Sequence, residues 1–418
     1  MKREAMNAEM VSRGDAEKVE GGRGSVRDPS HNSASRFTSN APWPKVKLGA
    51  IGKVVTGMTP PTKRSEYYTG SYLFVTPSDL FYDSYFINAT ERTISEIGHS
   101  KFATRFVPKD SVMYTCIASI GKIGIAQSDV LTNQQINSII PSKGTCGLFI
   151  YYLLRYATPY IQQQNAGCAV PIINKGDFEN IEIPLPPLPV QRRIADILSA
   201  YDDLIENNRR RIAILEETAR LTYRKWFGGA GQGNTATLGA ICREVRRGVS
   251  PDAIAPDTPY IGLEHMPRRS ISLCEWESAQ KVTSTKLAFE AGDILFGKIR
   301  PYFHKVGITF VDGVASSDAI VIKPLRPELH AYVLMTVSSD AFVAAASQGM
   351  KEGSKMPRAD WKQLLNYSVV MPDDDTLAEF NKVLNPIIEQ LKALCFSIRN
   401  LATARDMLLP RLMKGEGA

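Results

Sequence analysis

Residues 184–226 read PLPPLPVQRRIADILSAYDDLIENNRRRIAILEETARLTYRKW. The proline run cannot donate backbone hydrogen bonds, so it ends a preceding strand and marks the start of a helix. Apolar residues then recur at steps of four and three, a mean of about 3.5 residues, which is the coiled-coil period. In a helix that only covers its own domain, the apolar repeat would be closer to about 3.6 residues. We therefore expect a pairing seam at Ile194, Leu198, Tyr201, Ile205, Asn208, Ile212 and Leu215.

The end of the chain has the same period. A polar residue interrupts each seam, Asn208 in the first and Arg405 in the second, and such residues set register and orientation at some cost in stability. Pro386 is expected to kink the second helix or restart it one turn in. Acidic residues 373–375 suit its N-terminal end, where negative charge is stabilising. The second seam comprises Leu384, Ile387, Leu391, Leu394, Ile398, Leu401, Arg405 and Leu408.

The segments that precede the two helices form an internal repeat. One offset matches Phe106–Asp110 with Phe289–Asp293. It also pairs Lys122 with Lys305, Gly124 with Gly307, Pro141 with Pro324, and Asp177 with Asp360. The tetrapeptide Leu-Gly-Ala-Ile opens both copies, at Leu48 and at Leu238. The chain is therefore predicted to contain two related modules, each followed by a long helix.

Each module is expected to mix helices and strands. Short apolar runs punctuated by Gly, Pro, Asn and Asp predict strands near 111–117, 123–126 and 136–140. Their counterparts are 293–296, 306–310 and 319–322. Apolar periodicity predicts helices over Leu148–Gln164 and Leu329–Ala346.

Composition is that of an ordinary globular protein. Of 418 residues, 44% are hydrophobic and 22% charged, and the net charge of +7 permits a polyanionic partner without requiring one. No apolar run spans a membrane and no secretory signal opens the chain, so we expect a cytoplasmic protein. The six scattered cysteines predict buried thiols rather than a disulfide framework or a zinc site. Residues 1–41, rich in Gly and Ser, are predicted to be disordered.

Catalytic signatures fail when they are tested. Gly292–Lys298 nearly matches a phosphate-binding loop, but Ile299 stands where a Ser or Thr must bind Mg²⁺. The acidic run 373–375 lacks the Glu-x-Lys that would complete a nuclease site. The five histidines have no metal-ligand spacing. We therefore expect neither enzymatic activity nor a metal or cofactor in this chain.

Several segments resemble the specificity subunit of type I restriction–modification enzymes. They are Gln164–Asp177, Ile183–Ala195 and the helix through Trp226-Phe227 in the first half, then Asp293–Pro301, Gly313–Asp318, Lys355–Trp361 and Leu408–Met413 in the second. The resemblance runs in order from about residue 43 to 415. It implies an α+β fold with a pseudo-twofold internal repeat, in which two mixed α/β target-recognition domains are separated by two long antiparallel coiled-coil helices.

The resemblance also implies a division of labour. Each target-recognition domain reads one half of a split, asymmetric DNA site, while the helices fix the gap and dock two methyltransferase subunits. Restriction subunits join that core, and S-adenosylmethionine, ATP and Mg²⁺ belong to the partners. The expected parts are a tail (1–41), first domain (42–188), central helix (189–230), second domain (231–374) and C-terminal helix (375–418).

Candidate DNA contacts are of two kinds. Amide and hydroxyl side chains that could read base edges are Asn133, Gln134, Gln135, Asn137, Ser316 and Ser317, although a turn bonded to its own backbone explains the same segments. Cations that could meet phosphate are Lys63, Arg64, Lys101, Arg105, Lys122, Arg246, Arg247, Arg268, Arg269, Lys298, Arg300 and Lys305. The alternative reading of the whole chain is a coiled-coil scaffold with two protein-binding modules.

Overall fold

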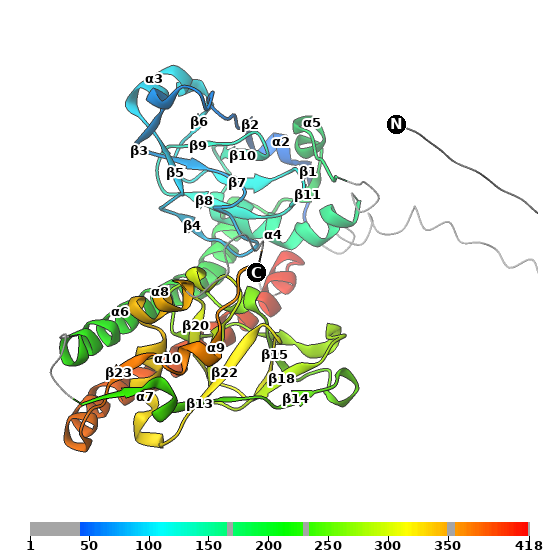
Figure 1. Cartoon of the computed structure of the whole chain (residues 1–418). Helices are drawn as coiled ribbons and strands as arrows, with labels where there is room; N and C mark the ends of the chain where they lie inside the picture. Colours follow the sequence, from blue (N-terminus) through cyan, green and yellow to red (C-terminus); the bar gives the residue numbers. More distant parts are fainter. Residues whose placement is uncertain (1–41, 165–169, 229–233, 349–355, 417–418) are drawn as a thin grey trace, which may run out of the picture.

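The computed structural model describes residues 42–164, 170–228, 234–348 and 356–416. The predicted disordered tail, residues 1–41, lies outside these ranges. Two modules, β1 to β11 and β12 to β23, are each followed by a helix of 40 residues (Figure 1).

Each module contains a five-stranded sheet with the same strand order. In both sheets the central strand lies between antiparallel neighbours, and the edge strand that closes the sheet pairs in parallel. Every strand carries apolar side chains into the core of its module, which explains the short apolar runs in the sequence. The first sheet is β2 (Gly52–Thr56), β10 (Ile136–Pro141), β7 (Val112–Thr115), β8 (Ile123–Ala126) and β4 (Phe86–Ile87), and the second is β13 (Cys242–Val245), β22 (Ala319–Pro324), β19 (Ile294–Gly297), β20 (Val306–Thr309) and β16 (Ser272–Leu273).

A further sheet in each module also repeats. The first module has β5 (Arg92–Ile94), β3 (Tyr68–Val75), β9 (Val130–Thr132) and β6 (Phe106–Val107), and the second has β17 (Glu277–Ser278), β15 (Pro259–Ile261), β21 (Gly313–Ala315), β18 (Lys286–Phe289) and, in addition, β14 (Gly248–Val249). A two-stranded ribbon completes each module, β1 (Lys45–Lys47) with β11 (Glu182–Pro184), and β12 (Thr235–Thr237) with β23 (Ser368–Val370). The predicted duplication is confirmed.

Strand pairing corrects the predicted alignment of the two copies by one residue. Val107 pairs with the first residue of β9 and Phe289 with the first residue of β21, so Phe289 matches Val107 rather than Phe106. The turns that follow agree, because the left-handed residues are Asp110 (φ 68°) and Gly292 (φ 96°). Asp293 is therefore the counterpart of Ser111, and the second copy gains one residue between β19 and β20.

The match of Asp177 with Asp360 is also wrong. The short helices α5 (Lys175–Glu179) and α9 (Trp361–Leu364) are equivalent, and their N-caps are Asn174 and Asp360. Asn174 accepts a hydrogen bond from the Asp177 backbone N–H at 2.9 Å, whereas Asp360 accepts from that of Lys362 at 3.0 Å. Two acidic residues near a helix start gave a coincidental match.

The module helices follow the apolar periodicity with one exception. Helix α4 (Gly147–Gln164) confirms the predicted 148–164 helix. The predicted single helix Leu329–Ala346 is instead α7 (His330–Val337) and α8 (Asp340–Gln348), with a bend of 64° between them. Ser338 and Ser339 break it, and the Ser339 hydroxyl accepts from the Phe342 backbone N–H at 3.2 Å. Among the described residues, no single helix is long and apolar enough to cross a membrane. The remaining module helices are α2 (Leu48–Ile51) and α3 (Glu96–Phe102).

The long helices α6 (Leu188–Phe227) and α10 (Asp374–Met413) lie side by side and antiparallel (Figure 1). The direction follows from two cross-helix contacts, Asn208 with Ser397 and Asp202 with Arg405. Asp373 caps α10 by accepting from the Thr376 backbone N–H at 2.7 Å, and this bond lowers the pKa of the Asp373 carboxyl. Helix α10 runs unbroken through Pro386, so the predicted restart there is wrong.

The seam between the helices is apolar with polar residues at fixed points. Most of the predicted seam residues are buried, and Tyr201, Leu215, Ile398, Leu401 and Leu408 are partly exposed. Asn208 donates from Nδ2 to the Ser397 hydroxyl at 3.0 Å. Burying an amide that has one complementary partner favours one register of the two helices over its neighbours.

A buried ion pair lies further along the seam. The Arg405 guanidinium bonds the Asp202 carboxylate, and both side chains are at most 4% exposed. The Tyr152 hydroxyl of α4 donates to Asp202 at 2.5 Å, and Arg155 of α4 pairs with Asp406 at 3.3 Å. Burial by itself would lower the pKa of Arg405, but the acceptors Asp406 and Asp202 raise it. This network joins α6, α10 and the first module.

The cysteines depart from the prediction of buried thiols. Cys274 and Cys395 form a disulfide between the second module and α10, across 121 residues of sequence. Cys116 and Cys242 are buried thiols, and Cys146 is a partly exposed one. Cys168 lies outside the described residues. Sequence spacing could not reveal the pair, because only the packing of the second module on α10 brings the two residues together.

We predict that replacing Arg405 by Met lowers the free energy of unfolding by about 3–5 kcal/mol, because the buried Asp202 then keeps only the more distant Arg155, at 3.9 Å, as a cation. The double variant Asp202→Leu, Arg405→Met should regain most of that loss, since neither charge of the pair is left buried without the other and Arg155 keeps Asp406. Urea denaturation measures both values. The control Arg411→Met, whose side chain is exposed and pairs with Glu416, should cost less than about 1 kcal/mol. An equal loss in Arg405→Met and Arg411→Met would contradict the prediction.

Candidate nucleic-acid interface

One turn occupies the same place in both modules. In the first module residues 133–135 connect β9 to β10, and in the second residues 316–318 connect β21 to β22. Asn133 donates its backbone N–H to Val75 O, and Ser316 donates to Ile261 O, both at 3.0 Å. The six amide and hydroxyl candidates from the sequence all lie in these turns or directly after the first of them.

Two of the amides in the first module serve local structure. Asn133 accepts from the Gln135 backbone N–H at 2.8 Å and donates to the Gln135 side chain at 3.2 Å. Asn137 is buried, where it accepts from the Thr56 hydroxyl at 2.7 Å and donates to Cys116 Sγ at 3.3 Å. Gln134 is exposed at the tip and accepts from the Thr59 hydroxyl at 2.6 Å. Gln134 is therefore the amide of this turn best placed to meet a ligand.

The cations of the first module lie on several different elements. The Arg105 guanidinium donates to Thr56 O at 3.5 Å, close to the turn, and Lys63 is exposed on the loop that follows Thr59. Arg64 pairs with Glu66 at 3.3 Å, and Lys101 is exposed on α3. Lys122 is partly buried and donates to Pro77 O at 2.8 Å, so it supports a loop.

In the second module, basic side chains gather beside the equivalent turn. Lys298 donates from Nζ to Ser317 O at 2.5 Å, and Arg358 pairs with Asp318 at 3.3 Å. Both residues line a hollow of about 490 Å³, together with Arg246, Lys362 and the acidic Glu244 and Asp360. Four cations beside three carboxylates, Asp318 included, leave this face a small positive excess, which favours a phosphate backbone.

The same positions in the first module carry no charge. Lys298 donates its backbone N–H to Asp318 O, as Cys116 donates to Gln135 O, so Lys298 and Cys116 are equivalent. The backbone of Arg358 forms an isolated β-bridge with Ile299, and that of Ile172 forms the same bridge with Ile117. Arg358 and Ile172 are therefore equivalent. The two modules thus share a backbone but present different chemistry at one face.

The remaining candidates of the second module are held by other residues. Arg246 pairs with Glu244 at 2.7 Å, Arg247 with Glu290 at 2.8 Å, and Arg269 with Asp340 at 3.0 Å. Arg268 and Arg300 lie over the Phe303 ring, 4.1 and 5.8 Å from its centre. Lys305 donates to Leu263 O at 2.5 Å, and burial lowers the pKa of its ammonium. Ser316 accepts from the Asp318 backbone N–H at 3.2 Å, which is the local turn bond that the sequence left open.

Sequence reasoning did not select Arg358 or Lys362. Their signal was present, because Arg358 lies within the Lys355–Trp361 segment that resembles specificity subunits. The seam prediction also omitted Asp202 and Glu216, since a periodicity search that looks for apolar residues passes over buried carboxylates.

One cluster of possible metal ligands occurs among the described residues. Ligand atoms of Glu264, His265 and Glu277 lie within 4.8 Å of one another. His265 accepts from the Gly262 backbone N–H through Nδ1 at 2.9 Å, so in the neutral ring Nε2 carries the proton. Neither nitrogen then offers a lone pair to a metal, and the cluster is better explained as the cap of a turn.

Comparison with known proteins agrees with this architecture. The model of the type I restriction modification DNA specificity domain matches residues 40–217. The MjaIX specificity subunit of Methanocaldococcus jannaschii is 26% identical over 406 residues, covering 90% of this chain and 93% of the relative. The HindI specificity subunit of Haemophilus influenzae is 29% identical over 175 residues, covering 40% and 38%. The S subunit of the type I restriction–modification system from M. genitalium has a similar fold, with a TM-score of 0.54, 16% identity, and coverage of 90% and 97%.

We predict that Lys298→Ala weakens binding of every DNA duplex alike and lowers the slope of log affinity against log salt by about one. A phosphate contact supplies affinity but carries no sequence information. Filter binding across a salt series measures the slope. Lys323→Ala is the matched control, because Lys323 lies in the same module but pairs with Glu290 at 2.7 Å. A slope that stays at the wild-type value in Lys298→Ala would remove this residue from the interface.

Proposed function

We propose that this chain, which is similar to type I restriction enzyme specificity subunits, reads a split, asymmetric DNA site for a methylation and restriction complex. The observation that carries the proposal is the pair of modules with one strand order and different side chains at one face. Two identical modules related by a twofold axis would read a palindrome. Two diverged modules suit two different half-sites.

The helix pair suits the role of a spacer. Each module contacts a different part of the pair, the first Asp202 and Asp406 and the second Glu216 and Cys395. Apolar and polar seam contacts oppose sliding of one helix along the other. The separation of the half-sites then follows from the length of the pair.

The outer face of the helix pair suits a docking role. Ile214, Leu221 and Leu204 of α6 are exposed by 66%, 53% and 52%, and Met407 of α10 by 69%. We propose that these exposed apolar side chains form part of a site of protein association. The proposed occupants are two methyltransferase subunits, through which restriction subunits join.

Chemistry then belongs to the partners. We propose that this chain is non-catalytic, that the methyltransferase subunits hold S-adenosylmethionine, and that the restriction subunits use ATP and Mg²⁺. Because the substrate is chromosomal and invading DNA, the proposed place of action is the cytoplasm.

We predict that the chain, bound to its methyltransferase, enriches one bipartite motif with a fixed gap from a random duplex pool. The two half-sites should differ, because the modules present different side chains to DNA. Repeated rounds of capture and sequencing measure the enrichment. A pool without any enriched motif would favour the alternative, a scaffold whose modules bind proteins.

We predict that Ile214→Lys weakens methyltransferase association at least about tenfold, because it places a charge in an apolar contact. Copurification and analytical ultracentrifugation measure the complex. Ile97→Lys is the control, since Ile97 is 59% exposed on α3, away from the helix pair. Unchanged association in Ile214→Lys would exclude this face as the dock.

A further inference from the structure

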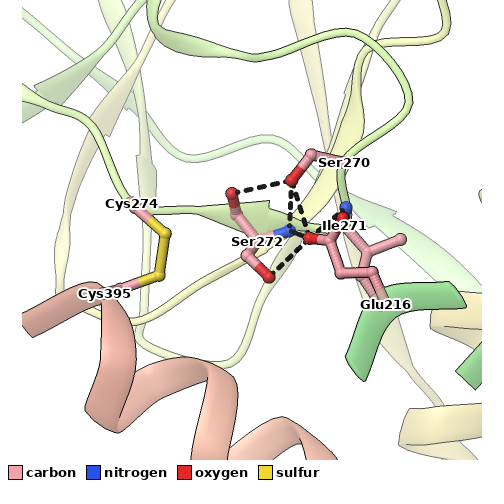
Figure 2. Close-up of a disulfide and its surroundings, with 6 residues drawn as sticks. All are labelled: Glu216, Ser270, Ile271, Ser272, Cys274 and Cys395. Carbon is pink, nitrogen blue, oxygen red and sulfur yellow. Dashed lines mark hydrogen bonds between the residues drawn. A yellow bond between two sulfur atoms is a disulfide. The ribbon is translucent and has the colours of Figure 1, made fainter. Parts of the chain in front are cut away.

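One short segment of the second module, residues 270–274, contacts both long helices (Figure 2), in addition to the apolar core that the module shares with them. This segment includes β16, the edge strand of the five-stranded sheet. Glu216 of α6 contacts its beginning, and Cys395 of α10 is bonded to its end. The segment therefore bridges the two helices.

Glu216 makes an unusually dense set of bonds to this segment. Its Oε1 accepts from the Ile271 and Ser272 backbone N–H groups, each at 3.0 Å, and from the Ser270 and Ser272 hydroxyls, each at 2.7 Å. Its Oε2 pairs with Arg220 at 3.5 Å. The Glu216 side chain is 6% exposed, so water cannot replace these bonds if the segment moves.

The opposite end of the segment is fixed to α10. Cys274 is joined to Cys395, and Trp276 packs edge-on against Phe396 with ring centres 6.0 Å apart. The Arg399 guanidinium lies 4.2 Å from the centre of the Trp276 ring. A rotation of the second module about Glu216 would have to break these contacts as well.

The first module has no such clamp at the equivalent place. Ser272 and Phe86 occupy equivalent places in the parallel edge strands of the two modules, so Cys274 corresponds to Asn88. Equivalent backbone hydrogen bonds just before α6 and α10 show that Leu185 and Met371 occupy the same place in the two halves. Counting along the helices from these two residues, Cys395 corresponds to Arg209, and Glu216 corresponds to Ala402. The contacts found there are an exposed ion pair of Asp83 with Arg209 at 3.3 Å and a side-chain hydrogen bond between Tyr85 and Asp203. Among the described residues, a clamp made of a buried carboxylate and a disulfide occurs in the second half and not in the first.

We propose that Glu216 is a positioning residue which, with the Cys274–Cys395 bond in the oxidised chain, fixes the pose of the second module and thereby the allowed gap between half-sites. The inference rests on the proposed function. Adding one base pair to the gap moves a half-site by about 3.4 Å and turns it by about 35° around the duplex. A module that cannot follow this movement loses one of its two sets of contacts, so a rigid pose selects one gap.

The test uses the full chain bound to its methyltransferase and duplexes that carry the enriched half-sites, with the gap shortened or lengthened by one base pair. For the wild type we expect about tenfold preference for the natural gap over either neighbour. In Glu216→Ala the preference should fall to about two- to threefold, while affinity for a duplex with the second half-site alone stays within about twofold. Competition binding measures each value, and circular dichroism checks folding.

Two further variants separate positioning from general destabilisation. Glu217→Ala is the matched control, because Glu217 is 52% exposed and its ion pairs, among the described residues, are with Arg220 and Arg224 of the same helix. Glu216→Gln keeps a neutral acceptor at the same place and should retain most of the gap preference. Cys395→Ser, and wild type treated with dithiothreitol, remove the other anchor. Dithiothreitol becomes a cyclic disulfide as it reduces the bond to two thiols. Both should broaden the gap preference even if Glu216→Ala does not fold.

The outcomes are distinguishable. An unchanged gap preference in folded Glu216→Ala, or in both Cys395→Ser and reduced wild type, overturns this inference and leaves the proposed function standing. Equal loss of affinity at every gap also overturns it, because that result indicates weakened folding rather than a freed pose. Failure of the wild type to recover two half-sites overturns the proposed function and this inference with it.

Discussion

The antiparallel contact between α6 and α10 is the constraint on which the rest of the molecule depends. An apolar seam provides most of the attraction, but apolar contacts tolerate sliding by one heptad, because the pattern repeats. The Asp202–Arg405 pair and the Asn208–Ser397 bond do not tolerate it, since each partner would be left buried without its complement. The polar residues therefore give the helix pair one register, and the register gives the modules one separation.

The modules use this frame differently. The first is fastened through its helix α4, whose Tyr152 and Arg155 reach the carboxylates of Asp202 and Asp406. The second is fastened through an edge strand that Glu216 and Cys395 hold from two sides. One duplicated fold has thus acquired two modes of attachment. A symmetric origin is compatible with an asymmetric reader, because attachment and reading surface diverge independently of the strand order.

The sequence predicted more of the fold than of the site. Periodicity identified both long helices, and the repeat identified two modules with one topology. Errors arose where a local rule competed with packing. Ser338 and Ser339 divide an apolar stretch whose pattern predicts one helix. One residue is inserted between β19 and β20, so the constant offset between the two copies does not hold before it, and Asp110 is not the counterpart of Asp293. For the candidate contacts, residue type indicated what Asn137 and Lys122 could do, but their partners Thr56 and Pro77 lie far along the chain.

The amino-acid sequence by itself determined the duplication, the coiled-coil period and the resemblance to specificity subunits, because each is a pattern along one dimension. Only the tertiary structure decided which polar groups meet: Arg405 with Asp202, Cys274 with Cys395, and Glu216 with residues 270–272. These contacts join residues that are distant in the chain, and the seam pattern constrains apolar positions while leaving buried charges unassigned. The physical reason is that a buried polar group is stable only beside its complement, and that complement is set by how the helices and modules pack.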